Sequence, residues 1–334
     1  MLDFSPLAAA AGGTPLVVLL AVLVVDLVLG FVPQMGHLHP PVPGVHRLLK
    51  GLESRLNRPN RSAANRTTRG AVVTVIVLSC AAVAGWGLWR LAVELPFGIV
   101  AEVVVLFLAL SQSRVISAMG EARDGLQDGD RDVARSALRT VVPGTHAGVD
   151  DFAVARALIE AGGQGFLSRL MGPVFWYCLA GLPGIIVYAA NRSLVTAFAA
   201  GGGDDEPFAF SAQSMQEALD YLPARLAALV LLSAGLFLPG ASPADGVKAL
   251  TRHGGSYPGR TGGWIFAPLA GVLGLALIGP KPAAGPVPAA GAWIGDGRAR
   301  AGAVDIRRAI YLLAVAALIV ITTVAGILLV KLSA

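Results

Sequence analysis

Long uncharged runs of hydrophobic residues dominate the chain and predict membrane-spanning helices. A bilayer core about 30 Å thick needs roughly 20 apolar residues in helical form. Runs of this kind without any Asp, Glu, Lys or Arg are Ala71 to Trp89, Leu170 to Ala190, Leu226 to Ala244 and Ala309 to Val330. We therefore predict an all-α, polytopic membrane protein in which each of these runs is one span.

Three further hydrophobic segments carry interruptions, which raises the prediction to about five to seven segments in all. Pro15 to Val32 contains Asp26, and Leu95 to Ser113 contains Glu102. Thr261 to Pro280 is uncharged but broken by Gly and Pro, which favours a re-entrant or unspanned segment. The first segment lacks the basic region of a cleavable signal peptide, so we expect it to be retained as a helix.

The charges between the spans predict the orientation of the chain. Between positions 47 and 69 the only acid is Glu53, and the basic residues are Arg47, Lys50, Arg55, Arg58, Arg61, Arg66 and Arg69. The positive-inside rule then places this loop in the cytoplasm and the N-terminus outside. Counting onward, Arg114 to Arg169 falls inside, and the acidic loop with Asp204, Asp205 and Glu206 falls outside. A multi-pass protein of a bacterial inner membrane is the expected class.

One polar stretch, from residue 113 to residue 169, has room for a small cytoplasmic helical insertion within a single domain of residues 1–334. From Ser113 to Thr140 the pattern predicts an amphipathic helical hairpin broken near Gly125 and Gly129. A second helix is expected from Asp151 to Glu160. For the following Gly162, Gly163 and Gly165 we favour a flexible turn over a phosphate-binding loop, because no Lys follows.

The composition is that of a membrane protein and excludes several other classes of protein. The chain has 334 residues, of which 55% are hydrophobic and 14% charged, and its mean hydropathy is +0.67. An ordinary soluble enzyme is therefore excluded. The net charge of 26 − 21 = +5 is modest and does not imply nucleic-acid binding. The two cysteines lie in apolar stretches, which argues against a disulfide framework.

Acids within spans are the first candidates for function, because burying a charge in the bilayer is costly. Asp26 lies near a helix end where its carboxylate would reach water, and Glu102 could pair with an Arg on a neighbouring segment. A functional and a structural role remain open for both. His37 and His39 could bind a metal, but without nearby Cys, Asp or Glu we favour a solvated loop.

Two motifs lie near the ends of the later segments. The sequence Gly295-Asp-Gly-Arg298 predicts a tight turn whose backbone N–H groups and cation suit an anionic ligand, with an ordinary surface turn as the alternative. Asp305 is expected to be the N-cap of the last helix. Pro223 is expected in the first turn of its helix.

An ordered series of motifs resembles the adenosylcobinamide-phosphate synthase family of cobalamin biosynthesis (CobD/CbiB). The series runs from about Asp26 to Arg308. Its members are Asp26 to Gly30 with His39-Pro40; Asp150-Asp151 with Arg156 and Ile159-Glu160; Pro173 to Trp176; Gly181 to Gly184 with Tyr188; Leu222 to Leu226; Trp264 to Gly274; Ile294 to Arg298; and Asp305 to Ala309.

The resemblance implies a membrane enzyme that forms an amide bond. Such an enzyme joins aminopropanol, or its O-phosphate, to the propionate carboxyl of adenosylcobyric acid with ATP and magnesium. Carboxyl activation would precede attack by the amine. The partners implied are these two substrates, the lipid bilayer and other membrane proteins of the cobalamin pathway, and not nucleic acid. The metal ligands stay unknown.

By this resemblance, one set of residues is assigned to catalysis and one to substrate binding. The catalytic set is Asp150, Asp151, Glu160, Glu217 and Asp220. The substrate-binding set is Asp26, Arg156, Arg225, Trp264, Gly295, Asp296, Gly297 and Arg298.

Several polar residues typical of the family are replaced in this chain. Gln164-Gly165 and Ser168-Arg169 stand where the family has Glu-Asn and Asp-Gly. Arg192 to Val195 replaces an Asn-Thr-Leu-Asp run, Gln216-Glu217 a pair of Asp, Phe266 a Glu, and Pro143-Gly144 an Arg-Asp. A divergent synthase is therefore one hypothesis. A non-catalytic relative that binds a corrinoid, regulates or assembles, as the AmpE-type membrane proteins do, is the second, and a transporter is a distant third.

Overall fold

The computed structural model describes residues 13–32, 43–58, 60–94, 98–142, 150–199, 207–255, 261–279 and 293–333. Nearly all of these residues are helical, and they contain no β-strand beyond two isolated bridges. The helices are α2 (Gly13–Phe31), α3 (Pro43–Leu56), α4 (Ala63–Glu94), α5 (Gly98–Ala109), α6 (Gln112–Asp128), α7 (Arg131–Val141), α8 (Asp151–Gly165), the π-helix η2 (Phe166–Met171), α9 (Gly172–Ala199), α10 (Phe210–Gly235), α11 (Pro243–His253), α12 (Gly262–Leu273) and α13 (Ala303–Ser333).

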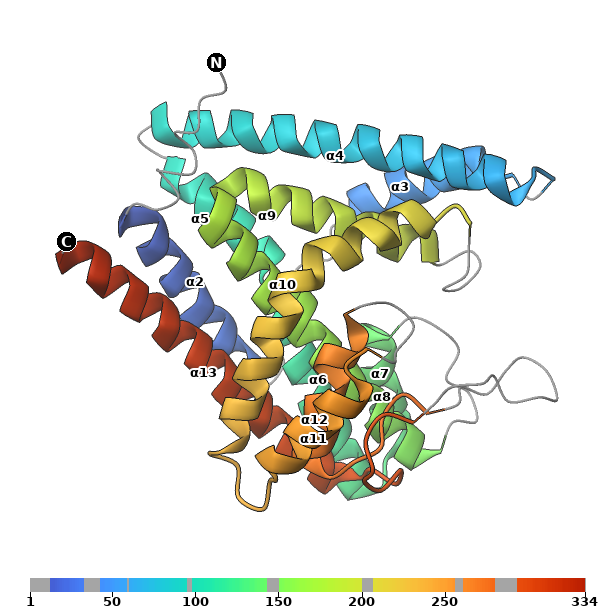
Figure 1. Ribbon diagram of the computed structural model, residues 1–334, viewed down its shortest axis with the longest axis vertical. Helices are drawn as coiled ribbons and strands as arrows, with labels where there is room; N and C mark the ends of the chain where they lie inside the picture. The colour runs from blue at the N-terminus through green and yellow to red at the C-terminus, as the bar shows by residue number, and fades with distance from the viewer. Residues whose placement is uncertain are drawn as a thin grey trace.

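The all-α membrane fold predicted from the sequence is confirmed. Five helices are long and apolar enough to cross a bilayer: Ala63–Glu94, Gly98–Asp128, Asp151–Phe198, Phe210–Gly235 and Ala303–Ser333. α2 is a shorter apolar helix that packs beside α13 and α6. In Figure 1, α2 and α13 run side by side, while α4 crosses above them with α3 next to it.

The predicted single span from Leu170 to Ala190 is wrong, because the chain reverses within α9. Gly181 has non-helical backbone angles (φ 61°, ψ −147°), and Pro183 follows it. On either side of this point the limbs lie against each other: Arg192 donates to the carbonyl of Ser168, and the Tyr188 ring abuts Gly172. Segments 168–180 and 182–192 therefore form an antiparallel helical hairpin whose tip is Gly181.

The first limb continues the helical run that begins with α8 and η2, and the returning limb ends at Ala199. The sides of the membrane on which the flanking loops lie stay predictions. The acidic residues Asp204 to Glu206 themselves lie outside the described residues. So do His37, His39, Pro40, Pro143 to Thr145 and most of the segment between α12 and Trp293.

The glycines after Glu160 form helix and not the predicted flexible turn. Gly162 and Gly163 are buried in α8, and an added Cβ would overlap Met119 and Leu313 at the first and Leu269 at the second. Small residues at such points let helices approach closely inside a membrane protein. The third glycine of the group, Gly165, likewise faces Gln112 at close range.

The remaining boundaries differ from the sequence pattern in instructive ways. The run from Leu226 to Ala244 belongs to α10, which begins sixteen residues earlier at Phe210 and ends at Gly235. Pro223 therefore lies inside this helix and not in its first turn. Within Thr261 to Pro280 only the buried, 12-residue α12 is helical, so the expectation of an unspanned segment is consistent with the structure.

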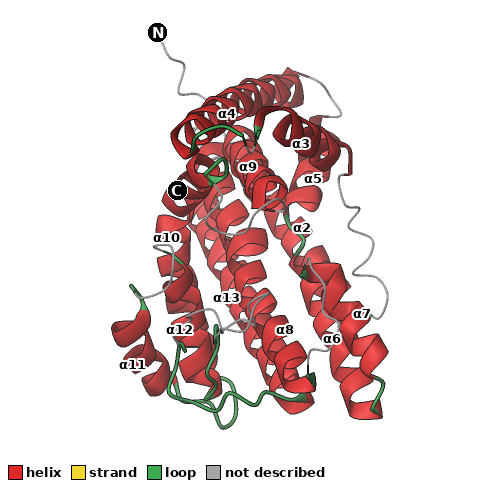
Figure 2. Cartoon of the chain, turned by 90° about the vertical axis from the view of Figure 1, so that its right-hand side faces the viewer, coloured by secondary structure: helices red, strands yellow, loops and turns green. Residues whose placement is uncertain are grey.

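The polar stretch folds against the other helices. α6 and α7 form the predicted helical hairpin, and the chain turns at Gly129, which has a left-handed conformation (φ 77°). α6 and α8 pack on α13, and their buried side chains belong to the same hydrophobic core as those of α2 and α12. Figure 2 shows α6, α7 and α8 lying together beside α13.

Candidate functional site

Residues far apart in the sequence meet at the end of the bundle where α8 begins. Arg156 of α8 donates a hydrogen bond to the carbonyl of Ala299 at 2.6 Å, and its guanidinium lies 5.2 Å from the centre of the Trp293 ring. Glu160, one turn later, accepts the backbone N–H of Ile278 at 2.7 Å. α8 therefore joins the segment after α12 to the segment before α13.

Backbone pairing holds the Gly295 to Arg298 turn against the end of α12. Leu277 and Ile294 exchange hydrogen bonds in an antiparallel bridge, and Arg298 pairs with Leu275 in a parallel one. Gly295 has φ 93°, and an added Cβ on Gly297 would overlap the backbone at Gly274. These glycines are thus required for the turn and its close packing, which is a structural reason for a motif that the sequence linked to ligand binding.

Two ion pairs involve the charged residues of this turn, Asp296 and Arg298. Arg298 bonds to Asp305 at 2.5 Å; its side chain is 59% exposed, whereas that of Asp305 is 3% exposed. Arg252 of α11 pairs with Asp296, and both are exposed. We call the set Arg156, Glu160, Arg252, Asp296, Arg298 and Asp305 the charged end.

Asp305 is not the N-cap of α13, as the sequence had suggested. It is the third residue of the helix, and its second carboxylate oxygen accepts the backbone N–H of Gly302 at 2.9 Å. An acid at this position satisfies a free N–H of the first helical turn, as in a capping box. The same carboxylate therefore starts the helix and orients Arg298.

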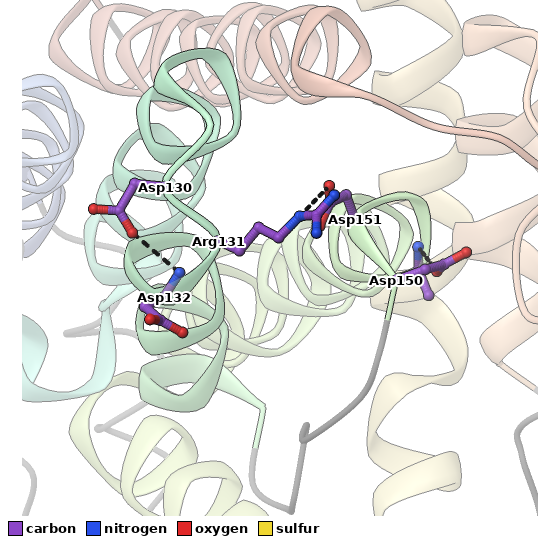
Figure 3. A network of polar contacts seen from close by, with 6 residues as sticks. Asp130, Arg131, Asp132, Asp150 and Asp151 are labelled. Carbon is purple, nitrogen blue, oxygen red and sulfur yellow. Dashed lines mark hydrogen bonds and ion pairs between the residues drawn. The ribbon is translucent and has the colours of Figure 1, made fainter.

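The structure gives Asp150 and Asp151 structural partners. Asp150 is the N-cap of α8 and accepts the N–H of Ala153 at 2.7 Å. Asp151 pairs with Arg131 at 3.0 Å, and Asp130 caps α7 beside it. In Figure 3 the side chain of Asp151 points to Arg131, and that of Asp150 lies on the other side of the helix start. The two carboxylates therefore do not converge on one point.

Asp220 lies in the interior, far from solvent. It accepts hydrogen bonds from the Tyr188 hydroxyl at 2.8 Å and from Gln216 at 3.0 Å, and it interacts electrostatically with Arg192. Asn191 donates to Gln216 and to the carbonyl of Ala212. The hairpin creates this arrangement, since Tyr188 and Arg192 belong to its returning limb.

Asp26 is also buried, at 2% exposure, which corrects the expectation that it reaches water. It accepts hydrogen bonds from the hydroxyl and the backbone N–H of Ser113, at 2.7 and 3.3 Å. Arg169 of the π-helix interacts electrostatically with both Asp26 and Arg192, and it donates to the Ser111 hydroxyl. A π-helical turn inside a longer helix is frequent at functional sites.

These residues form one line of polar groups through the protein. We call Asp26, Ser113, Arg169, Arg192, Tyr188 and Asp220 the interior polar seam. It balances two acids with two arginines. Sequence reasoning recognised both acids but missed both arginines as functional candidates, although the positions of Arg169 and Arg192 had been noted as departures from the family pattern. Those departures were the available signal.

The other predicted residues lie on or near α10. Arg225 stacks on Tyr221 and on Trp264 of α12, at 3.5 and 4.4 Å from the ring centres. Glu217 lines an open groove between α9 and α10. Glu102 bonds to the Tyr177 hydroxyl and not to an Arg, contrary to the expectation from the sequence.

The described residues do not provide a metal site of their own. No three His, Cys, Asp or Glu side chains among them are grouped so that they could hold an ion. Magnesium that arrives with nucleotide phosphates needs only one or two carboxylates, so this observation bears on a cage built by the protein alone.

Fold and site together define a multi-pass helical membrane protein with a charged end where α8, α11 and the start of α13 meet the turn after α12. The chain belongs to the CobD/Cbib protein family, whose model matches residues 18–313. This membership confirms the resemblance found in the motifs, and it places the chain in cobalamin biosynthesis with an adenosylcobinamide-phosphate synthase-like role.

Individual relatives give the same result. The chain is 32% identical over 299 residues to a cobalamin biosynthesis protein CobD of Sinorhizobium sp, with 88% of this chain and 92% of the relative covered. It is 29% identical to the CobD of Rhizobium meliloti (strain 1021), with coverage of 80% and 82%. For the CobD of Rhodobacter capsulatus the identity is 30%, with coverage of 77% and 80%. No solved structure matches the chain.

Proposed function

We propose that this protein is an amide-forming ligase of the bacterial inner membrane that joins aminopropanol, or its O-phosphate, to adenosylcobyric acid at the expense of ATP. One observation carries the proposal. Arg156, Glu160, the Gly295 to Arg298 turn and Asp305 all belong to motifs that carry the family resemblance, and direct contacts gather them at the charged end.

The charged end suits anionic substrates because the guanidinium of Arg298 is already oriented before a substrate binds. The buried carboxylate of Asp305 engages one edge of the Arg298 guanidinium, and most of that side chain stays exposed. An Arg side chain has five N–H donors, so several remain for phosphate or carboxylate oxygens. Preorganised cations stabilise the negative charge that develops as an activated carboxyl is attacked. We assign this role to Arg298, with Arg156 beside it.

In the proposed reaction the carboxyl is first activated with ATP, and the amine nitrogen then attacks it and forms the amide bond as the leaving group departs. The attacking ammonium must lose a proton. A carboxylate of the charged end, Glu160 or Asp296, is proposed to accept it, since Asp296 is exposed and Glu160 is partly exposed. The acids of the interior polar seam are buried. Asp150 and Asp151 are proposed to support α8 and not to take part in the chemistry.

Product formation tests the proposal. Purified protein in detergent is given adenosylcobyric acid, aminopropanol phosphate, magnesium and ATP, and the amide is measured by mass spectrometry. Arg298→Ala should lower the rate about 100-fold, the usual cost of one preorganised donor. Arg90→Ala, which removes an exposed arginine paired with Glu94 on α4, is the matched control and should leave the rate unchanged.

A specific observation favours a second candidate, a corrinoid-binding relative without catalysis. Arg169 stands where the family has Gly and Arg192 where it has Asn, each close to a position at which the family has an Asp, and both belong to the interior polar seam. If no amide forms while a motif-complete relative is active, a visible-absorbance titration with adenosylcobyric acid separates the cases. Saturable binding without turnover supports this second candidate.

A further inference from the structure

An aromatic groove on the surface between α9 and α10 has no part in the charged end. Its volume is about 690 Å³. The lining consists of Phe175, Trp176, Phe210, Ser214, Glu217, Ala218, Leu219, Tyr221 and Leu222. Phe210, Ser214, Glu217 and Tyr221 recur at helical spacing on one face of α10, so the groove follows that helix.

The wall of the groove on α9 is fixed in place. The Trp176 indole donates its N–H to the carbonyl of Leu219 at 3.1 Å, which ties α9 to α10. Phe175 packs edge to face on Trp176, with ring centres 5.5 Å apart. The indole face is therefore presented by a rigid side chain and not by a mobile one.

Glu217 is the one acid in this lining, and no described residue forms a hydrogen bond or an ion pair with it. Asp220, three residues later on the same helix, has two hydrogen-bond donors. Glu217 is the eighth residue of α10, and its side chain is partly exposed in the groove. Its carboxylate is therefore available to a ligand that enters the groove.

The lining determines the class of that ligand. No Lys or Arg lines the groove, which disfavours an anion. Aromatic faces next to a carboxylate are a recognised arrangement for an ammonium group. The volume exceeds what a bare ion needs, so the cation must carry an organic body.

We infer that the groove between α9 and α10 binds a primary ammonium group on a short organic chain, with Glu217 as its ionic partner and the Trp176 face as its aromatic wall. Two sources share this chemistry: a free amino alcohol or its phosphate, and the headgroup of an ethanolamine phospholipid. That the ligand would be the amine substrate rests on the proposed function; the ammonium site does not.

Direct binding tests the inference without any need for turnover. The full-length protein in detergent is titrated by calorimetry with 1-amino-2-propanol, with ethanolamine and with the neutral analogue 1,2-propanediol. Both amines should bind and the neutral analogue should not. Glu217→Gln should weaken amine binding about tenfold or more, the usual effect of losing one charge-assisted hydrogen bond. Glu94→Gln, an exposed acid on α4, is the matched control.

Binding measured in lipid nanodiscs distinguishes the two sources of the ammonium ligand. Weaker amine binding when ethanolamine phospholipid replaces phosphatidylglycerol, in the native protein but not in Glu217→Gln, assigns the groove to the lipid headgroup. Equal amine binding in both lipids assigns it to a free amine. Equal binding of the neutral analogue, or unchanged binding in Glu217→Gln, overturns the inference. Amine binding without amide formation would leave the groove in place and count against the proposed ligase alone.

Discussion

The charged end and the interior polar seam both pair arginines with aspartates, but they do so in different surroundings. At the charged end, Arg252 and Asp296 are both exposed, and Arg298 extends outward from Asp305. In the seam, Asp26 and Asp220 are buried and each accepts two hydrogen bonds. The first region keeps unused donors for a ligand, whereas the second has few. Breaking pairs should therefore affect binding at the charged end and stability in the seam.

The largest expected effect is on stability, in the seam. Asp220→Ala removes two hydrogen bonds and leaves Arg192 without its acidic neighbour. Unfolding in detergent should show a loss of about 3 kcal/mol, the lower end of the range for breaking a buried pair, because Arg192 is only partly buried. Glu217→Ala on the same helix is the control and should change stability by less than about 0.5 kcal/mol.

A double variant distinguishes pairing from general damage at this position. If Arg192 is the group left uncompensated, Asp220→Ala combined with Arg192→Leu should recover part of the loss. A double variant as unstable as the sum of the two single variants would contradict the pairing.

The hairpin that creates the seam should be the next most sensitive feature. Gly172→Ala would drive a methyl group into the Tyr188 ring and separate the two limbs. Overpacking of this kind costs about 1–3 kcal/mol, measured as a lower thermal midpoint. Gly87→Ala on α4 has open space around it and should be neutral or slightly stabilising. Equal behaviour of the two variants would argue against the antiparallel limbs.

Within the charged end, Asp305 and Asp296 should contribute different amounts to the stability of the protein. Asp305→Asn weakens a buried anchor that holds both Arg298 and the first turn of α13, so we expect a loss of about 1–2 kcal/mol. Asp296→Asn breaks an exposed pair and should cost less than about 1 kcal/mol, with an effect that vanishes at high salt. Thermal unfolding at low and high salt measures both. Equal losses would mean that Asp305 is not a special anchor.

The smallest expected effect concerns pH and lies outside both regions. Burial raises the pKa of Glu53 on α3 above its usual 4.5, against the opposing effects of Asn57 and Lys50. The folded state therefore holds this proton more tightly than the unfolded chain does. The contribution to stability is full below pH 4.5 and is lost as the pH rises through the raised pKa. The stability of Glu53→Gln relative to the native protein should increase from pH 4 to 7, and parallel profiles would contradict this.

The sequence predicted the helical class and the apolar segments because hydrophobic burial in a bilayer leaves an unmistakable run of residues. It could not predict where such a run turns back. The residues Gly181 to Gly184 lie in the middle of an uncharged run, and both limbs of the hairpin are equally apolar. The same limit hid the seam, since Arg169 and Arg192 flank this run and meet only after the chain has reversed.

The candidate site was predictable in part. Arg156, Glu160 and the turn at Gly295 to Arg298 were named from family motifs, and the structure brings them together. The same motifs grouped Asp150 and Asp220 with them, although one caps a helix and the other is buried in the seam. Sequence motifs identify residues under common constraint. They do not separate residues that contact a ligand from residues that hold the helices in place.

The reversal at Gly181 bears on which side of the membrane every later segment of the chain lies. A helix that crosses the bilayer exchanges the two sides for every residue after it, whereas a hairpin that enters and returns exchanges nothing. If both limbs enter the bilayer from one face, counting this run as one crossing assigns α10 and the helices after it to the opposite compartment. Reporters fused after Ser333 and in the basic loop near Arg58 distinguish the two cases: the same side supports a hairpin that returns, and opposite sides support a crossing.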